Sequence, residues 1–207
     1  MNSVIRTNDQ RLINYVRKEH LKVFKFPVFE LGLTDWYFKC GEDGMPVSGF
    51  SVAQVNEDSY PFVAEGKHPD EVWDEDVLKP RELTNLFSFN DQDWLQDIVD
   101  LMYAALCDFN TSGTSDVVVF THKPLLRFFE RKQGFDISYI EPTVKKLDAD
   151  SALERMKERY GFEGMNYDFE EHYLKRHRPR GVTFNVKQAL GKLEGSALSY
   201  EPTLMEA

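Results

Sequence analysis

Apolar residues recur at helical spacing in four stretches of the chain. The clearest stretch follows residue 94, where apolar positions at i, i+3, i+4, i+7, i+11 and i+14 form one continuous stripe along a helix. The residues of this stripe are Leu95, Ile98, Val99, Met102, Leu106 and Phe109. Shorter stripes predict further helices over residues 9–25, 125–132 and 149–160.

Elsewhere the apolar residues alternate with polar ones or form short runs, as they do in β-strands. Residues 36–40 and 47–55 flank the turn-forming segment 41–44, so they predict an antiparallel hairpin. Residues 82–89 and 135–140 predict two more strands, and 182–186 fits the same pattern. The run Val117–Phe120 is apolar throughout, which is typical of a strand covered on both faces.

These elements follow one another in the order hairpin, strand, helix, strand, helix, strand. That order predicts an α/β (α+β) fold in which helices flank a central mixed sheet. From about residue 145 the chain becomes polar and broken by glycine. We therefore predict one domain over residues 1–144 and a C-terminal extension, or arm, over 145–207, because the extension has too few apolar residues for a core of its own.

Charge and composition narrow the class of protein. The chain of 207 residues carries a formal net charge of −10, which argues against a surface devoted to nucleic acid. The first residues lack the apolar segment of a signal peptide, and no apolar run reaches the roughly 18 residues of a membrane span. Cys40 and Cys107 do not indicate a disulfide scaffold. We expect a cytoplasmic protein with reduced thiols and no membrane contact.

The hairpin, the strand over 82–89, the long helix and the strand Val117–Phe120, followed by segment 123–135, resemble the GNAT superfamily of N-acyltransferases, and two of these segments are also similar in sequence. Segment 123–135 is similar to the later helix of that fold, which ends in a Gly-Phe pair, here Gly134-Phe135. The other segment is most similar to the central strand of the acyl-homoserine-lactone synthase branch and reads Arg81-Glu82-Leu83-Thr84-Asn85-Leu86-Phe87. The resemblance covers roughly half of the chain and implies a GNAT-like sheet with acyl-CoA as the donor.

The resemblance also implies where a site would lie. The family places its general base on or near the central strand, which makes Glu82 the candidate, and His122 at the end of the next strand is a second acid–base candidate. Donor contacts are expected where the central strand passes into the long helix, at Phe87, Ser88, Phe89, Asn90 and Trp94. For Glu82 the alternative is an ion pair with Arg81 or Lys79. For His122 it is a helix cap.

Three departures from the family pattern bear on activity. The donor loop 88–94 has no glycine, lysine or arginine, and it contains two aspartates that repel a pyrophosphate. Many GNAT enzymes protonate the leaving thiolate with a tyrosine close before Gly-Phe, where this chain has Phe128 and Phe129. Asn85 stands where the synthase branch has an arginine.

Two functions are therefore open. One is an N-acyltransferase that takes acyl groups from acyl-CoA. The other is a catalytically silent GNAT-like protein with a structural or binding role. Because degenerate GNAT-like proteins are familiar in tailed bacteriophages, the second includes a virion or assembly component, in the virion or the host cytoplasm, and a host-directed regulator.

The extension offers contacts of its own. We expect a protein partner to bind the arm 145–207, and the basic run 175–180 is the one stretch suited to nucleic-acid phosphates or an acidic partner. The five-residue spacing of His172 and His177 does not place them on one helix face, so we expect no metal site.

Overall fold

The computed structural model describes residues 4–25, 27–28, 32–74, 77–90, 94–160 and 169–194. The strands are β1 (Val4–Thr7), β2 (Leu33–Cys40), β3 (Pro46–Gln54), β4 (Arg81–Ser88), β5 (Asp116–Thr121), β6 (Ser138–Tyr139) and β7 (Arg180–Asn185). The helices are α1 (Gln10–Phe24), α2 (Tyr60–Glu65), α3 (Trp94–Ser112), α4 (Lys123–Arg127), α5 (Ala149–Tyr160) and α6 (Val186–Leu193). A 3₁₀ turn (Pro69–Glu71) and two π-helical segments, η2 (Phe128–Lys132) and η3 (Phe169–His177), complete the described elements.

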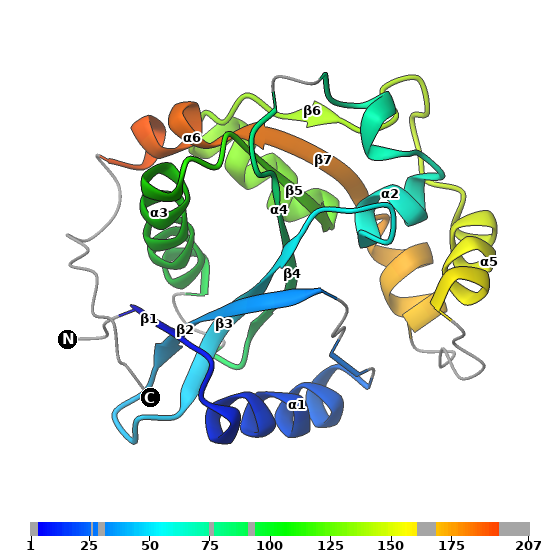
Figure 1. Cartoon of the computed structure of the whole chain (residues 1–207). Helices are drawn as coiled ribbons and strands as arrows, with labels where there is room; N and C mark the ends of the chain where they lie inside the picture. The colour runs from blue at the N-terminus through cyan, green and yellow to red at the C-terminus, as the bar shows by residue number, and fades with distance from the viewer. Residues whose placement is uncertain are drawn as a thin grey trace.

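One seven-stranded mixed sheet, in the order β1-β2-β3-β4-β5-β7-β6, organises the molecule (Figure 1). Neighbouring strands run antiparallel, except that β4 and β5 run parallel. The predicted α/β (α+β) class with a central mixed sheet flanked by helices is confirmed. The parallel pair follows from the long helix α3, which carries the chain back to the same end of the sheet before β5 begins.

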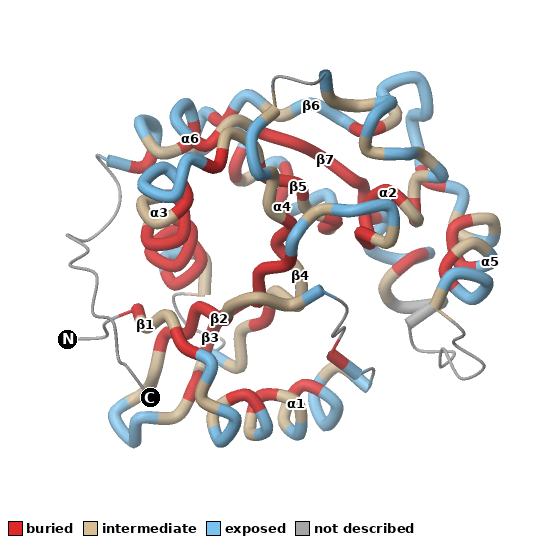
Figure 2. The backbone as a smooth tube through the Cα atoms, in the orientation of Figure 1, coloured by how far each residue is buried: buried red, intermediate tan, exposed pale blue. Residues whose placement is uncertain are grey.

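Helices cover both faces of this sheet (Figure 1). Because side chains alternate along a strand, Tyr37 of β2 points into the core under α3, while Trp36 and Phe38 pack under α1. The predicted apolar stripe of α3 is buried from Ile98 to Phe109, and Leu95 at its start is partly buried. Figure 2 shows buried residues concentrated along β4, β5 and the sheet-facing side of α3. The candidate site lies at this centre.

Close packing between β2, β3 and β4 depends on one glycine. A Cβ atom built on Gly49 would lie 2.5 Å from the carbonyl oxygen of Tyr37 and 2.7 Å from the Phe38 ring. No side chain fits there without moving the backbone, so a glycine at position 49 allows β3 to lie this close to β2.

The C-terminal segment is built into the sheet. The strand over 182–186 is present as β7, but it lies between β5 and β6 inside the sheet. Phe184 of β7 and Leu193 of α6 belong to the same core as α3. The boundary drawn at 144/145 therefore does not coincide with a break in packing, because residues with thin local apolar content still complete a core supplied by distant elements.

Two elements of the structure were not predicted, and one predicted strand is shorter than expected. The polar stretch after residue 56 contains α2, whose Phe62 and Ala64 are fully buried. Val4–Thr7 forms an edge strand, which is too short to show a clear alternation of apolar and polar residues. The strand predicted over 135–140 shrinks to Ser138–Tyr139, because Phe135 packs instead against Phe129 and Phe184.

Candidate functional site

The central feature is the separation of the two parallel strands. β4 and β5 are paired at three positions, which end at Leu83 opposite Val119. Beyond this point β4 carries a bulge, since Ser51 pairs with Thr84 but Gly49 pairs with Phe87, which leaves two residues of β4 opposite one of β3. Asn85 sits in the bulge at φ 54°, a left-handed conformation that asparagine tolerates better than most residues.

The bulge turns β4 away from β5 and opens a hollow between them. Its volume is about 90 Å³. We call it the β4–β5 cleft. Side chains from both strands, from α1 and α2, and from η3 line it, namely His20, Tyr60, Glu82, Leu83, Thr84, Asn85, Leu86, Val119, Phe120, Thr121, His122 and Tyr173. The structure therefore brings both predicted catalytic residues, Glu82 and His122, to one cleft.

Glu82 is a buried carboxyl group. Its exposed fraction is 4%, and among the described residues no cation pairs with it, so the ion pair with Arg81 or Lys79 is not formed. Burial raises the pKa of Glu82 to about 7, although a hydrogen bond from the Ser59 hydroxyl and one from the Tyr60 backbone N–H at 3.2 Å oppose the shift. A carboxyl group with this pKa exchanges a proton near neutral pH.

His122 caps α4, as the alternative interpretation had it, and it also lines the cleft. The backbone N–H of Leu125 donates to its Nδ1 at 3.2 Å. Burial, together with the nearby His177 ring, lowers the pKa of His122 below its usual value of 6.5. The neutral ring therefore carries its hydrogen on Nε2. In this state His122 donates a hydrogen bond from Nε2 and does not act as a base there.

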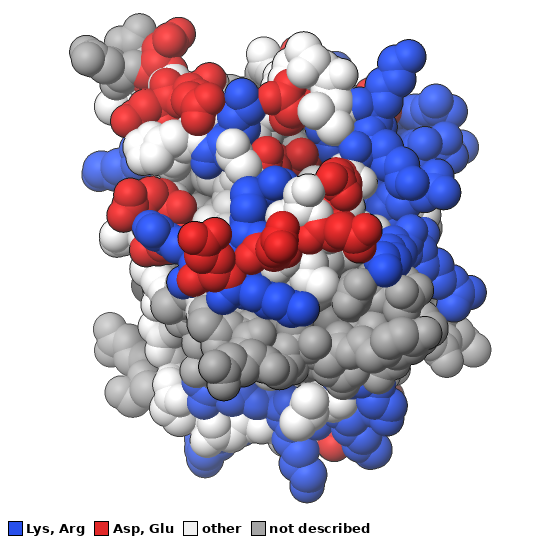
Figure 3. Space-filling view, turned by 90° about the vertical axis from the view of Figure 1, so that its right-hand side faces the viewer, with Lys and Arg blue, Asp and Glu red and all other residues white. Residues whose placement is uncertain are grey.

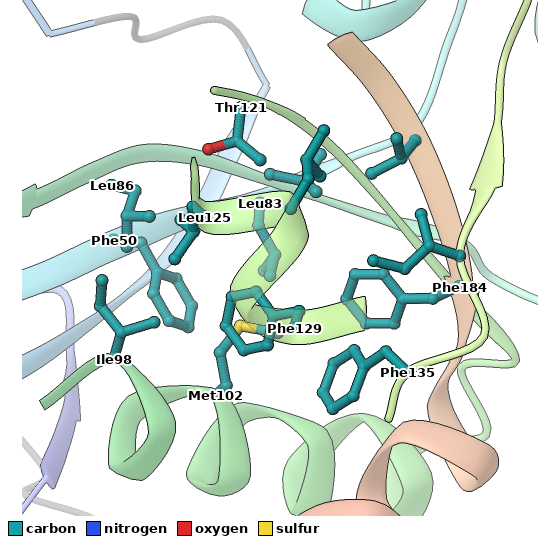
Figure 4. A pocket seen from close by; sticks show the side chains of 14 residues that line it. Phe50, Leu83, Leu86, Ile98, Met102, Thr121, Leu125, Phe129, Phe135 and Phe184 are labelled. Atoms are coloured by element: carbon teal, nitrogen blue, oxygen red, sulfur yellow. The ribbon is translucent and has the colours of Figure 1, made fainter. Parts of the chain in front are cut away.

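A second hollow, apolar, lies on the α3 side of the same strand separation (Figure 4). Leu83, Leu86, Val119 and Thr121 line both it and the cleft, so the two meet between β4 and β5. Its volume is about 30 Å³, enough for one or two water-sized groups. The other walls come from β3, α3, α4, η2, the segment before β6, and β7. Their lining residues are Phe50, Ile98, Met102, Leu125, Leu126, Phe129, Phe135, Ile137, Val182 and Phe184.

Four of the five residues predicted to contact the donor line one hollow. A third hollow of about 320 Å³ lies where β4 ends and α3 and α4 begin, and Phe87, Ser88, Asn90 and Trp94 line it together with His122. Phe89 turns away and packs against Phe87, with ring centroids 4.7 Å apart. The two loop aspartates, at 91 and 93, lie outside the described residues. Among the described residues that line this hollow there is no lysine or arginine, which suits an apolar or neutral group better than a diphosphate.

Beneath Ser88 lies a buried charged network that the sequence did not indicate. The Nζ of Lys39 lies 2.7 Å from carboxylate oxygens of both Asp97 and Asp100. Ser48 donates to Asp97 at 2.9 Å and lies 2.8 Å from the Ser88 hydroxyl. The network fastens the start of α3 to β2 and β3 and reaches Ser88, which lines the third hollow. In the sequence, Asp97 and Asp100 are polar residues inside a predicted helix. Polar residues of that kind are equally typical of the exposed face of a helix, so they did not indicate a buried network.

Tyrosines enter the cleft from elements that sequence reasoning did not place there. Tyr60 comes from α2, and Tyr173 comes from η3, where its hydroxyl donates to the Phe120 carbonyl at 3.3 Å. Where many GNAT enzymes have a tyrosine close before Gly-Phe, this chain has phenylalanines, and Phe129 forms an apolar wall of the second hollow. Nothing local in the sequence around residues 60 and 173 marked either tyrosine.

Within the part of the chain that the structure describes, no group of three metal-ligating side chains comes together. His172 falls among the residues whose side chains are not described. No described helix is both long and apolar enough to cross a membrane.

Comparisons with known proteins bear on the fold. No family model matches the sequence, and no curated protein matches it significantly. Among solved structures, the acyl-homoserine-lactone synthase LasI is 12% identical with a TM-score of 0.55, and the match covers 96% of each chain. MesI, a CoA-dependent synthase of the same kind, is 10% identical with a TM-score of 0.57 over 98% of this chain and 100% of its own.

BjaI, solved with SAM and isopentyl-CoA, is 14% identical with a TM-score of 0.53, over 94% of this chain and 84% of that one. Identities this low speak for the fold and not for the chemistry. The predicted resemblance is confirmed at that level. The chain has a GNAT-like fold, which it shares with these acyl-homoserine-lactone synthases.

Proposed function

We propose that this chain is an acyltransferase that moves an acyl group from a thioester donor of the acyl-CoA class to an amine. The observation that carries the proposal is the separation of β4 from β5, which joins a buried carboxyl group of pKa about 7 to an apolar hollow. A proton acceptor beside a dry apolar chamber is what aminolysis of a thioester requires.

In this reaction, the surroundings of each residue decide its role. The first carbons of the acyl chain lie in the apolar hollow, and the thioester carbonyl lies between β4 and β5. Glu82 takes a proton from the amine as its nitrogen attacks the carbonyl carbon, so that a C–N bond forms and the C–S bond breaks. The electron pair leaves on sulfur, and His122 donates a hydrogen bond from Nε2 to the developing charge.

The departing thiol needs no tyrosine in this scheme. A thiol with an ordinary pKa of about 8.5 leaves as a thiolate with modest help and takes its proton from water. Glu82 returns its proton to solvent once the product leaves. In this scheme the two hollows receive the thioester and the first carbons of the acyl chain, whereas the third hollow gives the donor's phosphates no cation among the described lining residues.

The test follows thiol release from acetyl-, butyryl- and octanoyl-CoA against a panel of primary amines. Glu82→Gln keeps the shape of the side chain but removes the base, so we expect kcat to fall by about 10²–10⁴-fold. Glu154→Gln on the exposed face of α5 is the matched control and should leave the rate unchanged. Failure of the wild-type protein to release thiol with any pair, or equal rates for both variants, would refute the proposal.

A catalytically silent binding protein is the second candidate. It is favoured by the phenylalanine wall where the family has its tyrosine and by the lack of cations among the described residues that line the third hollow. Binding of acyl-CoA without turnover would select it. The roles in a bacteriophage particle, in host regulation and in partner binding through 145–207 stay predictions.

A further inference from the structure

A basic groove lies beside the start of α4, and Glu82 is not among the residues that line it. Its volume is about 300 Å³, and it runs between the start of α4, β6, the segment 142–147 and the start of β7. Three separate stretches of chain contribute cations to it, namely Lys123, Lys145, Lys146 and Arg178. We call these four residues and the hollow between them the basic groove.

Within the described part of the chain, the charges of these four side chains are not paired. Among the described residues none of the four side chains makes an ion pair or a hydrogen bond. The nearby acids are engaged elsewhere, since Glu141 pairs with Lys67 at 3.1 Å and Glu65 pairs with Arg180 at 2.9 Å. Like charges that face one hollow repel each other, and a bound anion relieves that repulsion.

Arg178 is held in the groove by a strained backbone. Its φ is 48°, in the left-handed region, and it directly precedes Pro179, which disfavours compact conformations at the residue before it. Strain of this kind persists where surrounding contacts enforce it, and it concentrates at sites with a task. Here it lies beside the strongly anchored Arg180, whose side chain donates to two backbone carbonyls and to Glu65.

The groove also has an aromatic and apolar surface. Tyr139 lines it with the Arg180 guanidinium 5.2 Å from its ring centroid, and Leu126 and Leu147 add apolar area. Figure 3 shows Lys and Arg gathered along one edge of the side that bears α5, while Asp and Glu form a band across it. A local excess of cations on a chain of net charge −10 is a specific arrangement and not the average surface.

We propose that the basic groove binds the diphosphate group of a phosphorylated small molecule. Two adjacent lysines, a third lysine and one guanidinium match the charge and the several acceptor oxygens of a diphosphate. Tyr139 and the leucines then contact the organic part. The inference does not rest on acyl transfer, because it concerns a hollow that holds neither Glu82 nor His122.

Free pyrophosphate and coenzyme A both present this chemistry, so both serve as probes. Inorganic pyrophosphate is titrated calorimetrically into the full chain and into Lys145→Glu/Lys146→Glu. The matched control is Lys187→Glu/Lys192→Glu, which makes the same charge change on exposed positions of α6. We expect the groove variant to bind pyrophosphate about tenfold or more weakly than the wild type, while the control changes little. Lys123→Gln provides a milder second groove variant.

Equal pyrophosphate affinities in the groove and control variants would overturn the proposal, as would no heat at millimolar pyrophosphate with the wild type. With coenzyme A, loss of affinity in the groove variant identifies its diphosphate as an occupant. Coenzyme A binding that survives in the groove variant, while pyrophosphate binding is lost, assigns the groove to a different phosphorylated ligand. Because binding is measured without turnover, an inactive protein does not obscure the result.

Discussion

Burial of Glu82 predicts an unusual dependence of stability on pH. The carboxyl group has a pKa of about 7 in the folded chain against an ordinary value of 4.5, because burial disfavours its charged form. Between these two values the unfolded chain has released the proton and the folded chain has kept it. Stability from this group is therefore fully present below about pH 4.5 and is lost as pH rises to about 7.

The magnitude follows from the two pKa values. Their separation corresponds to about 3.4 kcal/mol in the free energy of unfolding once both states are ionised. Between pH 5 and pH 8 the same values give a loss of about 2.5 kcal/mol. Glu82→Gln removes the ionisation and keeps an oxygen to accept the Tyr60 N–H, so its stability should not show this loss.

The measurement is urea unfolding of both proteins at pH 5, 6, 7 and 8, expressed as the difference between them. Subtraction cancels the other titrating groups. We expect the variant to gain about 2.5 kcal/mol relative to the wild type across this range. A difference that stays constant within about 0.5 kcal/mol would show that Glu82 is not buried as described, and its part in catalysis would fall with it.

Three other outcomes follow from packing and charge. Lys39→Ala leaves its two aspartate partners buried without a cation, and we expect a loss of about 3–5 kcal/mol in urea unfolding, against almost none for the exposed Lys18→Ala. Gly49→Ala places a Cβ against backbone and should destabilise the protein by about 1–3 kcal/mol. Gly191→Ala on α6 meets open space and should stabilise the protein by about 0.5–1 kcal/mol. Equal effects of the two substitutions on the unfolding midpoint would contradict the close approach at Gly49. Asn85→Ala should cost about 1–3 kcal/mol because it strains the left-handed bulge and removes the 2.7 Å hydrogen bond to Ser51, and Asn85→Gly should recover the backbone part of that loss.

The elements that the sequence predicted well are those with a strong local period. The stripe from Leu95 to Phe109 predicted α3, and the turn at 41–44 with its flanking alternation predicted the β2–β3 hairpin. Glu82 was marked by its likeness to a family strand, although its burial was not. Short elements such as β1 and α2 carry too few residues for a period to show, so they became visible only through what they pack against.

Sequence alone determined the fold class, because helix and strand periods and their order along the chain restrict how one core can be built. Tertiary structure decided the rest. It inserted β7 between β5 and β6, buried Lys39 with two aspartates, and brought Tyr60 and Tyr173 to the cleft. These outcomes depend on which distant residues meet, and no local pattern of apolar and polar positions encodes a meeting between segments far apart in the chain.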